Sequence, residues 1–178
     1  ADAILFCFRD INADILSVAE NCKVASRYGI GVDNIDISKC TDQGIVVTNI
    51  PDYCLEEVSD HAIAMILSLN RRISDHSNMV KDGGWHDLNL DIPVQRLSNS
   101  TLGIVGFGRI GKTIAKRVSG LGIKCVAYDP LLQSGTSIEG VSIVEFKDLL
   151  EKSDFITVHV PLNDKTYHLF SEKEFEQM

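Results

Sequence analysis

The chain has 178 residues, of which 44% are hydrophobic and 24% charged, the ordinary range for a globular protein with a buried core. There are 17 Lys and Arg against 25 Asp and Glu, so the net charge is −8. This charge excludes nucleic acid and anionic membrane surfaces as partners recognised by bulk electrostatics. The longest apolar runs fall far short of the ~20 residues that a membrane span needs.

The five cysteines are scattered, odd in number and form no Cys-x-x-Cys pair. A disulfide framework or a zinc site needs closer and more regular spacing. We therefore expect free thiols, no metal site and a cytoplasmic location.

The first half of the chain alternates short strands and helices, which is typical of a parallel sheet. Strands are predicted over residues 3–8, 23–26 and 45–48. Helices are predicted over residues 11–18, where Ile11, Ile15 and Val18 recur at helical spacing, and over residues 36–43.

A longer helix is predicted over residues 56–73, with apolar residues at positions 58, 62, 65, 66, 69 and 73. Further apolar positions widen this stripe beyond one face, so we expect the helix to be buried between domains or against a second subunit. Residues 83–100, which contain a glycine pair and Pro93, are typical of an irregular connection between domains.

The second half again alternates, with strands predicted over residues 102–106, 124–128, 141–144 and 155–159 and helices over residues 110–121 and 146–150. The first strand and helix enclose the motif Gly106-x-Gly108-x-x-Gly111. In such a motif the first glycine permits a tight turn, the second lets backbone approach a pyrophosphate, and the third lets helix and strand pack closely. The N–H groups of Arg109 and Ile110 would then point at the phosphates, assisted by the helix dipole.

Asp129 ends the following strand, 129 − 106 = 23 residues after the first glycine and near the expected spacing of about 20. A carboxylate at this position accepts hydrogen bonds from ribose hydroxyls and repels a 2′-phosphate, and no basic residue follows closely. The sequence therefore favours NAD over NADP. Two alternatives stay open, a purely structural glycine turn and an S-adenosylmethionine site.

His159, Val160 and Pro161 follow the last predicted strand, at the edge where parallel sheets bind ligands. We interpret them as part of the cofactor site. A catalytic acid role for His159 is the alternative, although the sequence offers no evident partner carboxylate.

Together these stretches resemble the D-isomer-specific 2-hydroxyacid dehydrogenases along nearly the whole chain. The matching stretches are residues 27–36, 49–54, 57–61, 102–111, 128–130 and 159–162. The resemblance implies an α/β fold: an incomplete, doubly wound Rossmann sheet with part of a flavodoxin-like substrate domain. Residues 1–98, including the long helix, would form the partial substrate domain, and residues 99–178 the partial NAD-binding domain.

The resemblance also implies roles for matching positions. The backbone around Ile30 and Gly31 would meet the substrate carboxylate and the nicotinamide, although a plain turn after a strand is the alternative for this glycine-rich loop. Arg109 and Ile110 would hold the pyrophosphate, Asp129 the ribose, and Val160 would lie near the nicotinamide.

In this family the reaction needs an Arg, a Glu and a His that lie beyond the His-x-Pro-Leu motif, and the chain stops at Met178 before any of them. We therefore assign no catalytic residue and expect the chain, which also begins without Met, to be an excerpt that does not turn over substrate. Residues 155–158 should form a bare sheet edge that promotes self-association.

For the whole protein the resemblance implies NAD-linked interconversion of a D-2-hydroxy acid and a 2-keto acid, in a homodimer formed through the long helix. The alternative is an NAD(H)-sensing dimeric scaffold of the corepressor type.

Overall fold

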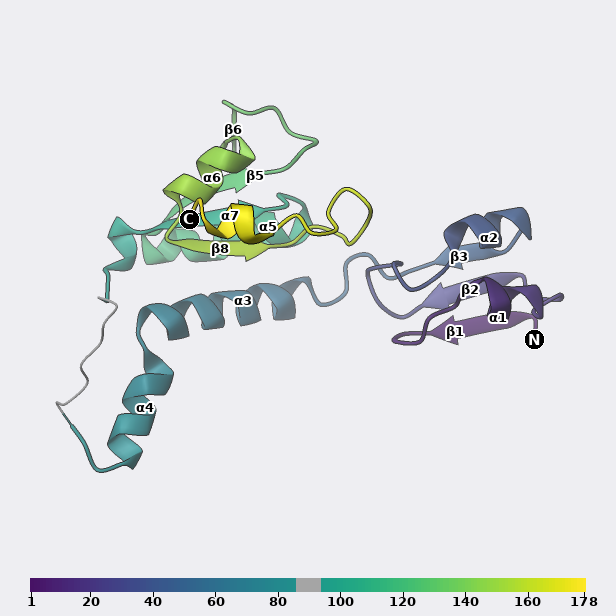
Figure 1. Ribbon diagram of the computed structural model, residues 1–178, viewed down its shortest axis with the longest axis horizontal. Helices are drawn as coiled ribbons and strands as arrows, with labels where there is room; N and C mark the ends of the chain where they lie inside the picture. The colour runs from purple at the N-terminus through teal and green to yellow at the C-terminus, as the bar shows by residue number, and fades with distance from the viewer. Residues whose placement is uncertain (86–93) are drawn as a thin grey trace. The chain divides into compact units, whose positions relative to one another are not determined.

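The computed structural model describes residues 1–85 and 94–178. The chain divides into two compact units, Ala1–Cys54 with Pro161–Leu169, and Leu55–Val160 with Phe170–Met178. Each unit has a sheet and a hydrophobic core of its own (Figure 1).

The first unit is built on a three-stranded parallel sheet of order β1-β2-β3. Its elements are β1 (Ala3–Phe6), α1 (Ala13–Ser17), β2 (Val24–Arg27), α2 (Ile37–Asp42) and β3 (Val46–Thr48). The predicted alternation is confirmed, and no element end differs from its prediction by more than two residues.

The apolar stripe predicted for the first helix is wrong. The helix begins only after Asn12, whose side chain accepts the N–H of Ile15 and caps the helix. This start turns Leu16 fully into the core and leaves Val18 81% exposed. Ile11 lies outside the helix, in an isolated bridge to another segment.

The second unit contains a five-stranded sheet of order β6-β7-β5-β4-β8. Its strands are β4 (Thr101–Val105), β5 (Lys124–Tyr128), β6 (Ser137–Ile138), β7 (Val141–Ile143) and β8 (Phe155–Val158). All pairs are parallel except β6 with β7. The order β7-β5-β4-β8 is that of a doubly wound sheet, as predicted, with β8 at one edge.

Among the described residues this unit also contains five helices. They are α3 (Leu55–Asn70), α4 (Ile73–Lys81), α5 (Arg109–Val118), α6 (Phe146–Lys152) and α7 (Glu172–Phe175), with 3-10 turns at Leu97–Asn99 and Ser119–Leu121. Leu102 and Ile104 of β4 share a core with α5, whereas a Cβ at the intervening Gly103 would lie 2.7 Å from the Leu149 side chain of α6. Because side chains alternate along a strand, α5 and α6 cover opposite faces (Figure 1).

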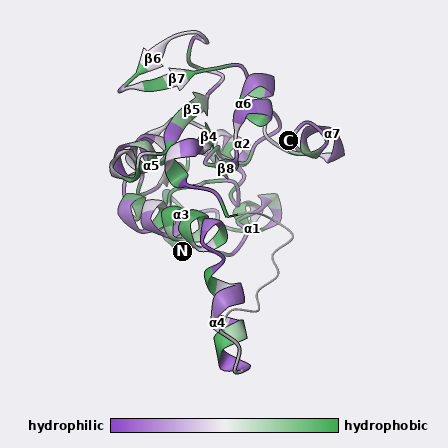
Figure 2. Ribbon diagram, turned by 90° about the vertical axis from the view of Figure 1, so that its left-hand side faces the viewer, coloured by the Kyte–Doolittle hydropathy of each residue, from purple (hydrophilic) through white to green (hydrophobic). Residues whose placement is uncertain are grey.

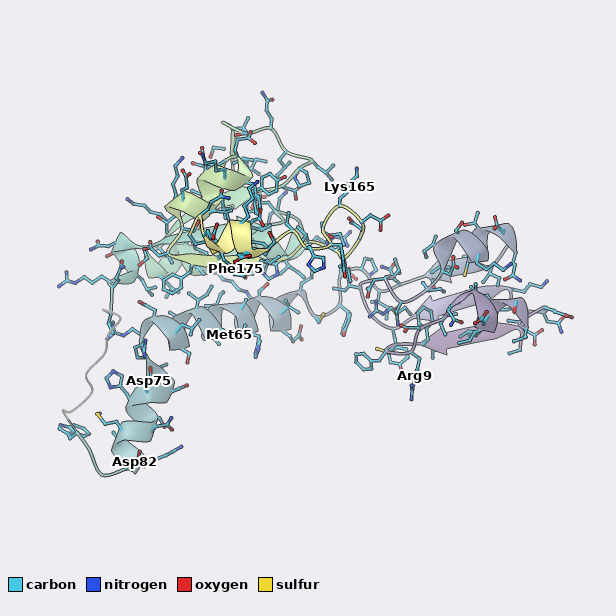
Figure 3. All side chains as sticks on the ribbon, viewed as in Figure 1. Arg9, Met65, Asp75, Asp82, Lys165 and Phe175 are labelled. Atoms are coloured by element: carbon cyan, nitrogen blue, oxygen red, sulfur yellow. The ribbon has the colours of Figure 1, made fainter. Side chains whose placement is uncertain are left out.

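The long helix is shorter and less buried than predicted. It ends at Asn70, Arg72 adopts a left-handed conformation with φ 52°, and a separate helix starts at Ile73. Ala62 and Ile66 pack against α5, while Met65 (labelled in Figure 3) and Leu69 are 52% and 68% exposed. Hydrophobic and hydrophilic residues therefore both line this helix, as Figure 2 shows.

The two units part between Cys54 and Leu55, because α3 packs on α5. This is a division by packing, and the assignment of residues 1–98 and 99–178 to partial substrate and NAD-binding domains stays a prediction. Within the predicted irregular connection, residues 86–93, which include Pro93, lie outside the described part of the chain.

Across residues 1–85 and 94–178, no helix combines the length and the apolar character required to cross a membrane. All five cysteines are free thiols, as expected.

Candidate functional site

The glycine motif forms a turn between β4 and α5, as predicted. Gly106 has φ 92°, a conformation that favours glycine, and a Cβ there would lie 2.7 Å from the carbonyl oxygen of His159. Gly108 is the N-cap residue of α5. Residues 106–108 therefore reverse the chain at the carboxyl end of the sheet, where ligands of such folds bind.

Gly108 and Gly111 differ in their surroundings. A Cβ on Gly111 would overlap the carbonyl oxygen of Gly106 and lie 3.0 Å from Ile104, so this glycine permits the close packing of α5 on β4. A Cβ on Gly108 would meet no atom of the described residues within 4 Å. The backbone at Gly108 thus borders open space, as a phosphate-binding turn requires.

The first turn of α5 is suited to an anion. The first intrahelical bond runs from the N–H of Lys112 to the carbonyl of Gly108, and helix geometry leaves the preceding N–H groups, including that of Ile110, without intrahelical acceptors. No acidic side chain lies in this turn to neutralise the positive end of the helix dipole. Arg109, the first helical residue, is exposed at the same end.

Asp129 follows β5, and its carboxylate faces the glycine turn. Its Oδ2 accepts the N–H of Phe107 at 3.0 Å, and its Oδ1 accepts the N–H of Leu131 at 3.0 Å. Asp129, which is predicted to bind the ribose, therefore also stabilises the glycine turn. The sequence analysis missed Phe107, and the signal that would have found it is its position between the first two glycines of the motif.

His159 and Val160 also border the turn. The N–H of His159 donates to the carbonyl of Val105 at 2.7 Å, and a Cβ on Gly106 would lie 3.0 Å from the side chain of Val160. Pro161 groups with the first unit, where its carbonyl accepts the hydroxyl of Thr166. The carboxyl end of β8 is therefore packed directly against the glycine turn.

The ring of His159 is half-buried and hydrogen-bonds to Thr157, with 2.7 Å between Nε2 and Oγ1. Burial lowers the pKa of this imidazole. The ring lines a pocket of about 660 Å³ between α3 and β8, together with Glu57, His61 and six apolar or hydroxyl-bearing neighbours. Among the described residues, no group of histidine, cysteine and acidic side chains is arranged to hold a metal ion.

In the first unit, Ile30 and Gly31 lie in a loop after β2 that is fixed from one side. The carbonyl of Gly29 accepts the N–H of Ile50 at 3.0 Å, and that of Ile30 accepts the amide Nδ2 of Asn49 at 2.7 Å. The carbonyl of Gly31 accepts Nη1 of Arg27. The sequence analysis did not single out Arg27 or Asn49.

The chain is similar to known proteins of one dehydrogenase family. Residues 63–178 match the family model for the NAD binding domain of D-isomer specific 2-hydroxyacid dehydrogenases. A glyoxylate reductase from Thermococcus litoralis is 39% identical over 186 residues, covering 99% of this chain and 56% of the relative. A D-3-phosphoglycerate dehydrogenase from Archaeoglobus fulgidus is 38% identical over 169 residues, covering 94% of this chain and 32% of the relative.

Among solved structures, a D-lactate dehydrogenase from Aquifex aeolicus in complex with NAD and lactic acid gives a TM-score of 0.92 at 31% identity. The match covers 100% of this chain and 54% of that one. The chain thus spans about half the length of the lactate dehydrogenase and of the glyoxylate reductase. Because the family model matches more than half of the chain, this chain belongs to the D-isomer specific 2-hydroxyacid dehydrogenase family and carries sequence of its NAD-binding domain.

Proposed function

We propose that the whole protein is an NAD-dependent oxidoreductase that interconverts a D-2-hydroxy acid and a 2-keto acid. The observation that carries the proposal is the Asp129 carboxylate, held on a glycine turn at the N-terminus of α5. The names of the relatives, glyoxylate reductase and D-3-phosphoglycerate dehydrogenase, support a small hydroxy or keto acid as substrate.

The residues around the turn fit NAD. The open space at Gly108 leaves room for a diphosphate at the positive end of α5, where Arg109, Ile110 and Gly111 supply backbone N–H groups. The carboxylate of Asp129 would accept the ribose hydroxyls. When bound, NAD supplies a hydride acceptor and donor for C2 of the substrate.

The remaining assignments concern the turn's neighbour and the first unit. Gly106 gives the turn its shape, and His159, Val160 and Pro161 would border the nicotinamide part of the site. In the first unit the backbone of Ile30 and Gly31 would bind the substrate carboxylate, and Ile30 would also meet the nicotinamide. We assign none of the chain's side chains to proton transfer.

The cofactor assignment is tested by calorimetric titration of the chain with NADH and NADPH. We expect NADH to bind more tightly, and Asp129→Asn to weaken NADH about tenfold through loss of charge-assisted hydrogen bonds. Asparagine has one amide oxygen, which can still accept the Phe107 N–H of the turn, while the bond from the Leu131 N–H is lost. Asp164→Asn, at an exposed carboxylate, is the control. A folded chain that binds neither dinucleotide would refute the assignment.

Turnover is tested by following NADH absorbance with glyoxylate, hydroxypyruvate or pyruvate. We expect this chain to bind NADH and the whole protein to reduce at least one of these acids. If the complete protein binds NADH, associates on binding and reduces none of them, the scaffold alternative is favoured instead.

Homodimer formation is the second candidate feature, and the exposed apolar residues of α3 favour it. Met65, which lines the pocket, and Leu69 are both exposed on this helix, whereas the packed residues Ala62 and Ile66 are buried. We expect sedimentation velocity to give a dimer that Leu69→Glu shifts toward monomer. Val18→Glu, an equivalent change at an exposed apolar residue of the first unit, should leave the dimer intact.

A cytoplasmic location is the last part of the proposal, and the five free thiols support it, because disulfides are rare in reducing compartments. Cell fractionation with antibody detection tests this location. Recovery with the membrane or secreted fraction would contradict it.

A further inference from the structure

We propose that Asn49 and Arg27 are positioning residues for the loop whose Ile30 and Gly31 N–H groups bind the substrate carboxylate. Asn49 directs the peptide plane that carries the N–H of Gly31, and Arg27 fixes the next peptide plane through the carbonyl of Gly31. The inference rests on the proposed function, in which this loop binds the carboxylate. It adds two side chains, those of Asn49 and Arg27, which are not among the site residues predicted from the sequence.

The argument starts from three successive carbonyl groups. Those of Gly29, Ile30 and Gly31 accept, respectively, the N–H of Ile50, the amide of Asn49 and the guanidinium of Arg27. Each bond fixes the direction of one peptide plane. Three consecutive peptide planes of the loop are therefore each fixed by a hydrogen bond.

The direction of the N–H groups follows from peptide geometry. The described residues contain no cis peptide bond, and in a trans peptide the N–H points opposite to the carbonyl of the preceding residue. Fixing the carbonyls of Gly29 and Ile30 toward their donors therefore turns the N–H groups of Ile30 and Gly31 the other way. Within the described chain neither N–H donates to a backbone acceptor. Successive N–H groups directed to one side form an anion-binding concavity.

Arg27 supports the loop by packing as well as by charge. A Cβ on Gly29 would lie 3.1 Å from its Nε, and one on Gly31 would lie 3.0 Å from its Nη1. A Cβ on Gly31 would also lie 2.7 Å from Oδ1 of Asp33, so side chains at these two positions would displace the guanidinium and its carboxylate partner. Neither glycine has a positive φ. Asp33 accepts from the same Nη1 at 3.3 Å, which holds the side chain in place.

The charge of Arg27 also favours an anion. Its side chain is mostly buried, and its Nε is buried with no partner among the described residues. A poorly solvated cation beside the loop raises the local positive potential, which favours the binding of a carboxylate.

The test uses NMR of the ¹⁵N-labelled chain with glyoxylate as probe, acetate as a carboxylate lacking the keto group, and acetamide as the uncharged control. In the wild-type chain glyoxylate and acetate should shift the amide signals of Ile30 and Gly31, and acetamide should not. Asn49→Ala should weaken the binding of glyoxylate about tenfold, because it removes the hydrogen bond to the carbonyl of Ile30 that directs the N–H of Gly31. Asn49→Gln, which keeps the amide donor, should restore most of the affinity.

Further variants separate positioning from folding. Thr48→Val removes a hydroxyl that bonds to Ser26 and does not touch the loop, so it should bind glyoxylate like the wild type. Arg27→Lys should retain more affinity than Arg27→Met, since it keeps the charge. Equal glyoxylate affinity in the wild type, Asn49→Ala and Arg27→Met would overturn the inference alone. Absence of any loop shift in the wild type would overturn the carboxylate site as well, while NADH binding would test the cofactor site separately.

Discussion

The glycines of the turn after β4 are required for different physical reasons. Gly106 needs its positive φ and lies against a carbonyl, Gly111 lies where a methyl group would overlap backbone, and Gly108 faces open space. At Gly108 the surrounding residues impose no such restriction, and in the proposed function the restriction comes from the bound diphosphate.

Two alanine substitutions separate these roles. Gly111→Ala should lower the free energy of unfolding by about 1–3 kcal/mol, the usual cost of overpacking, because α5 has to move away from β4. Gly108→Ala should leave the stability nearly unchanged and weaken NADH about tenfold or more by filling the phosphate space. Urea denaturation and NADH titration measure both effects. Wild-type NADH affinity in Gly108→Ala would contradict this division.

His159 gives the molecule a pH dependence. Its imidazole is half-buried beside Thr157, and burial lowers its pKa. The unfolded chain therefore binds more protons than the folded chain between this lowered pKa and about 6.5. The sign follows directly: stability rises with pH across this window.

We accordingly expect the free energy of unfolding to fall as the pH drops below about 6.5, through the window ending at the lowered pKa. His159→Gln should flatten this slope because it removes the titrating group. His76→Gln, at an exposed position on α4, should retain the slope. Urea denaturation at a series of pH values gives the measurement, and an unchanged slope in His159→Gln would assign the dependence to another group.

At the scale of elements, α3 shows that a helix can be broadly apolar and still bury one narrow face. Its packed residues are Ser59, Ala62, Ile66 and Asn70, of which two are polar. The hydroxyl of Ser59 is satisfied by the carbonyl of Leu55 at 2.6 Å. Small residues at this interface allow α3 and α5 to approach closely, so burial follows side-chain size as well as hydropathy.

Adjacent residues of α3 offer a matched pair. Ile66→Ala should lower the free energy of unfolding by about 2–5 kcal/mol, because it empties a buried volume in the core shared with α5. Met65→Ala, at a residue that is 52% exposed within the single chain, should change it by no more than about 0.5 kcal/mol when the protein is dilute enough for the proposed dimer to dissociate. Similar losses in both variants under this condition would mean that Met65 is buried within the single chain.

The sequence predicted the order of the main strands and the glycine turn because buried parallel strands and the Gly-x-Gly-x-x-Gly motif are strong local signals. It missed β6 because that strand has two residues and its hairpin turn uses Glu139-Gly140, both with positive φ, instead of the common Asn-Gly pair. It also missed α7, although Ser171 and Glu174 form a capping box that is visible in the sequence.

The loop at Ile30 illustrates what a linear sequence leaves undetermined. Its glycines are visible in the sequence, but the hydrogen-bond donors to its carbonyl groups come from other segments. Arg27 lies at the end of β2, and Asn49 and Ile50 follow β3. These donors meet the loop only because β2 and β3 pair in parallel register. Contacts of this kind depend on tertiary pairing, which residue patterns along one segment do not contain.

At the scale of the whole molecule, the two units have separate hydrophobic cores. One core comprises residues of β1, α1, β2 and α2 and of the segments that join them, and it includes Leu16. The other lies between the five-stranded sheet, α3 and α5. Since no buried residue belongs to both clusters, each unit has its own source of stability.

We therefore expect two unfolding transitions in urea when NMR signals of the two units are followed separately. Leu16→Ala should destabilise only the first unit, by about 2–5 kcal/mol, and Ile114→Ala only the second, by a similar amount. Leu5→Ala, at a residue that is mostly exposed, is the control. A single transition that both core variants shift equally would contradict independent cores.

The hydrogen bond between Asp129 and the amide of Phe107 has a consequence for how this protein can change over evolution or by engineering. In the proposed function, the side chain that discriminates between NAD and NADP is also the one that accepts the N–H of Phe107 within the turn. Changing the cofactor preference from NAD to NADP therefore requires two substitutions. One replaces Asp129 so that the 2′-phosphate can bind, and the other supplies a new acceptor for the N–H of Phe107. A change in cofactor preference at Asp129 therefore also changes the hydrogen bonding of the glycine turn.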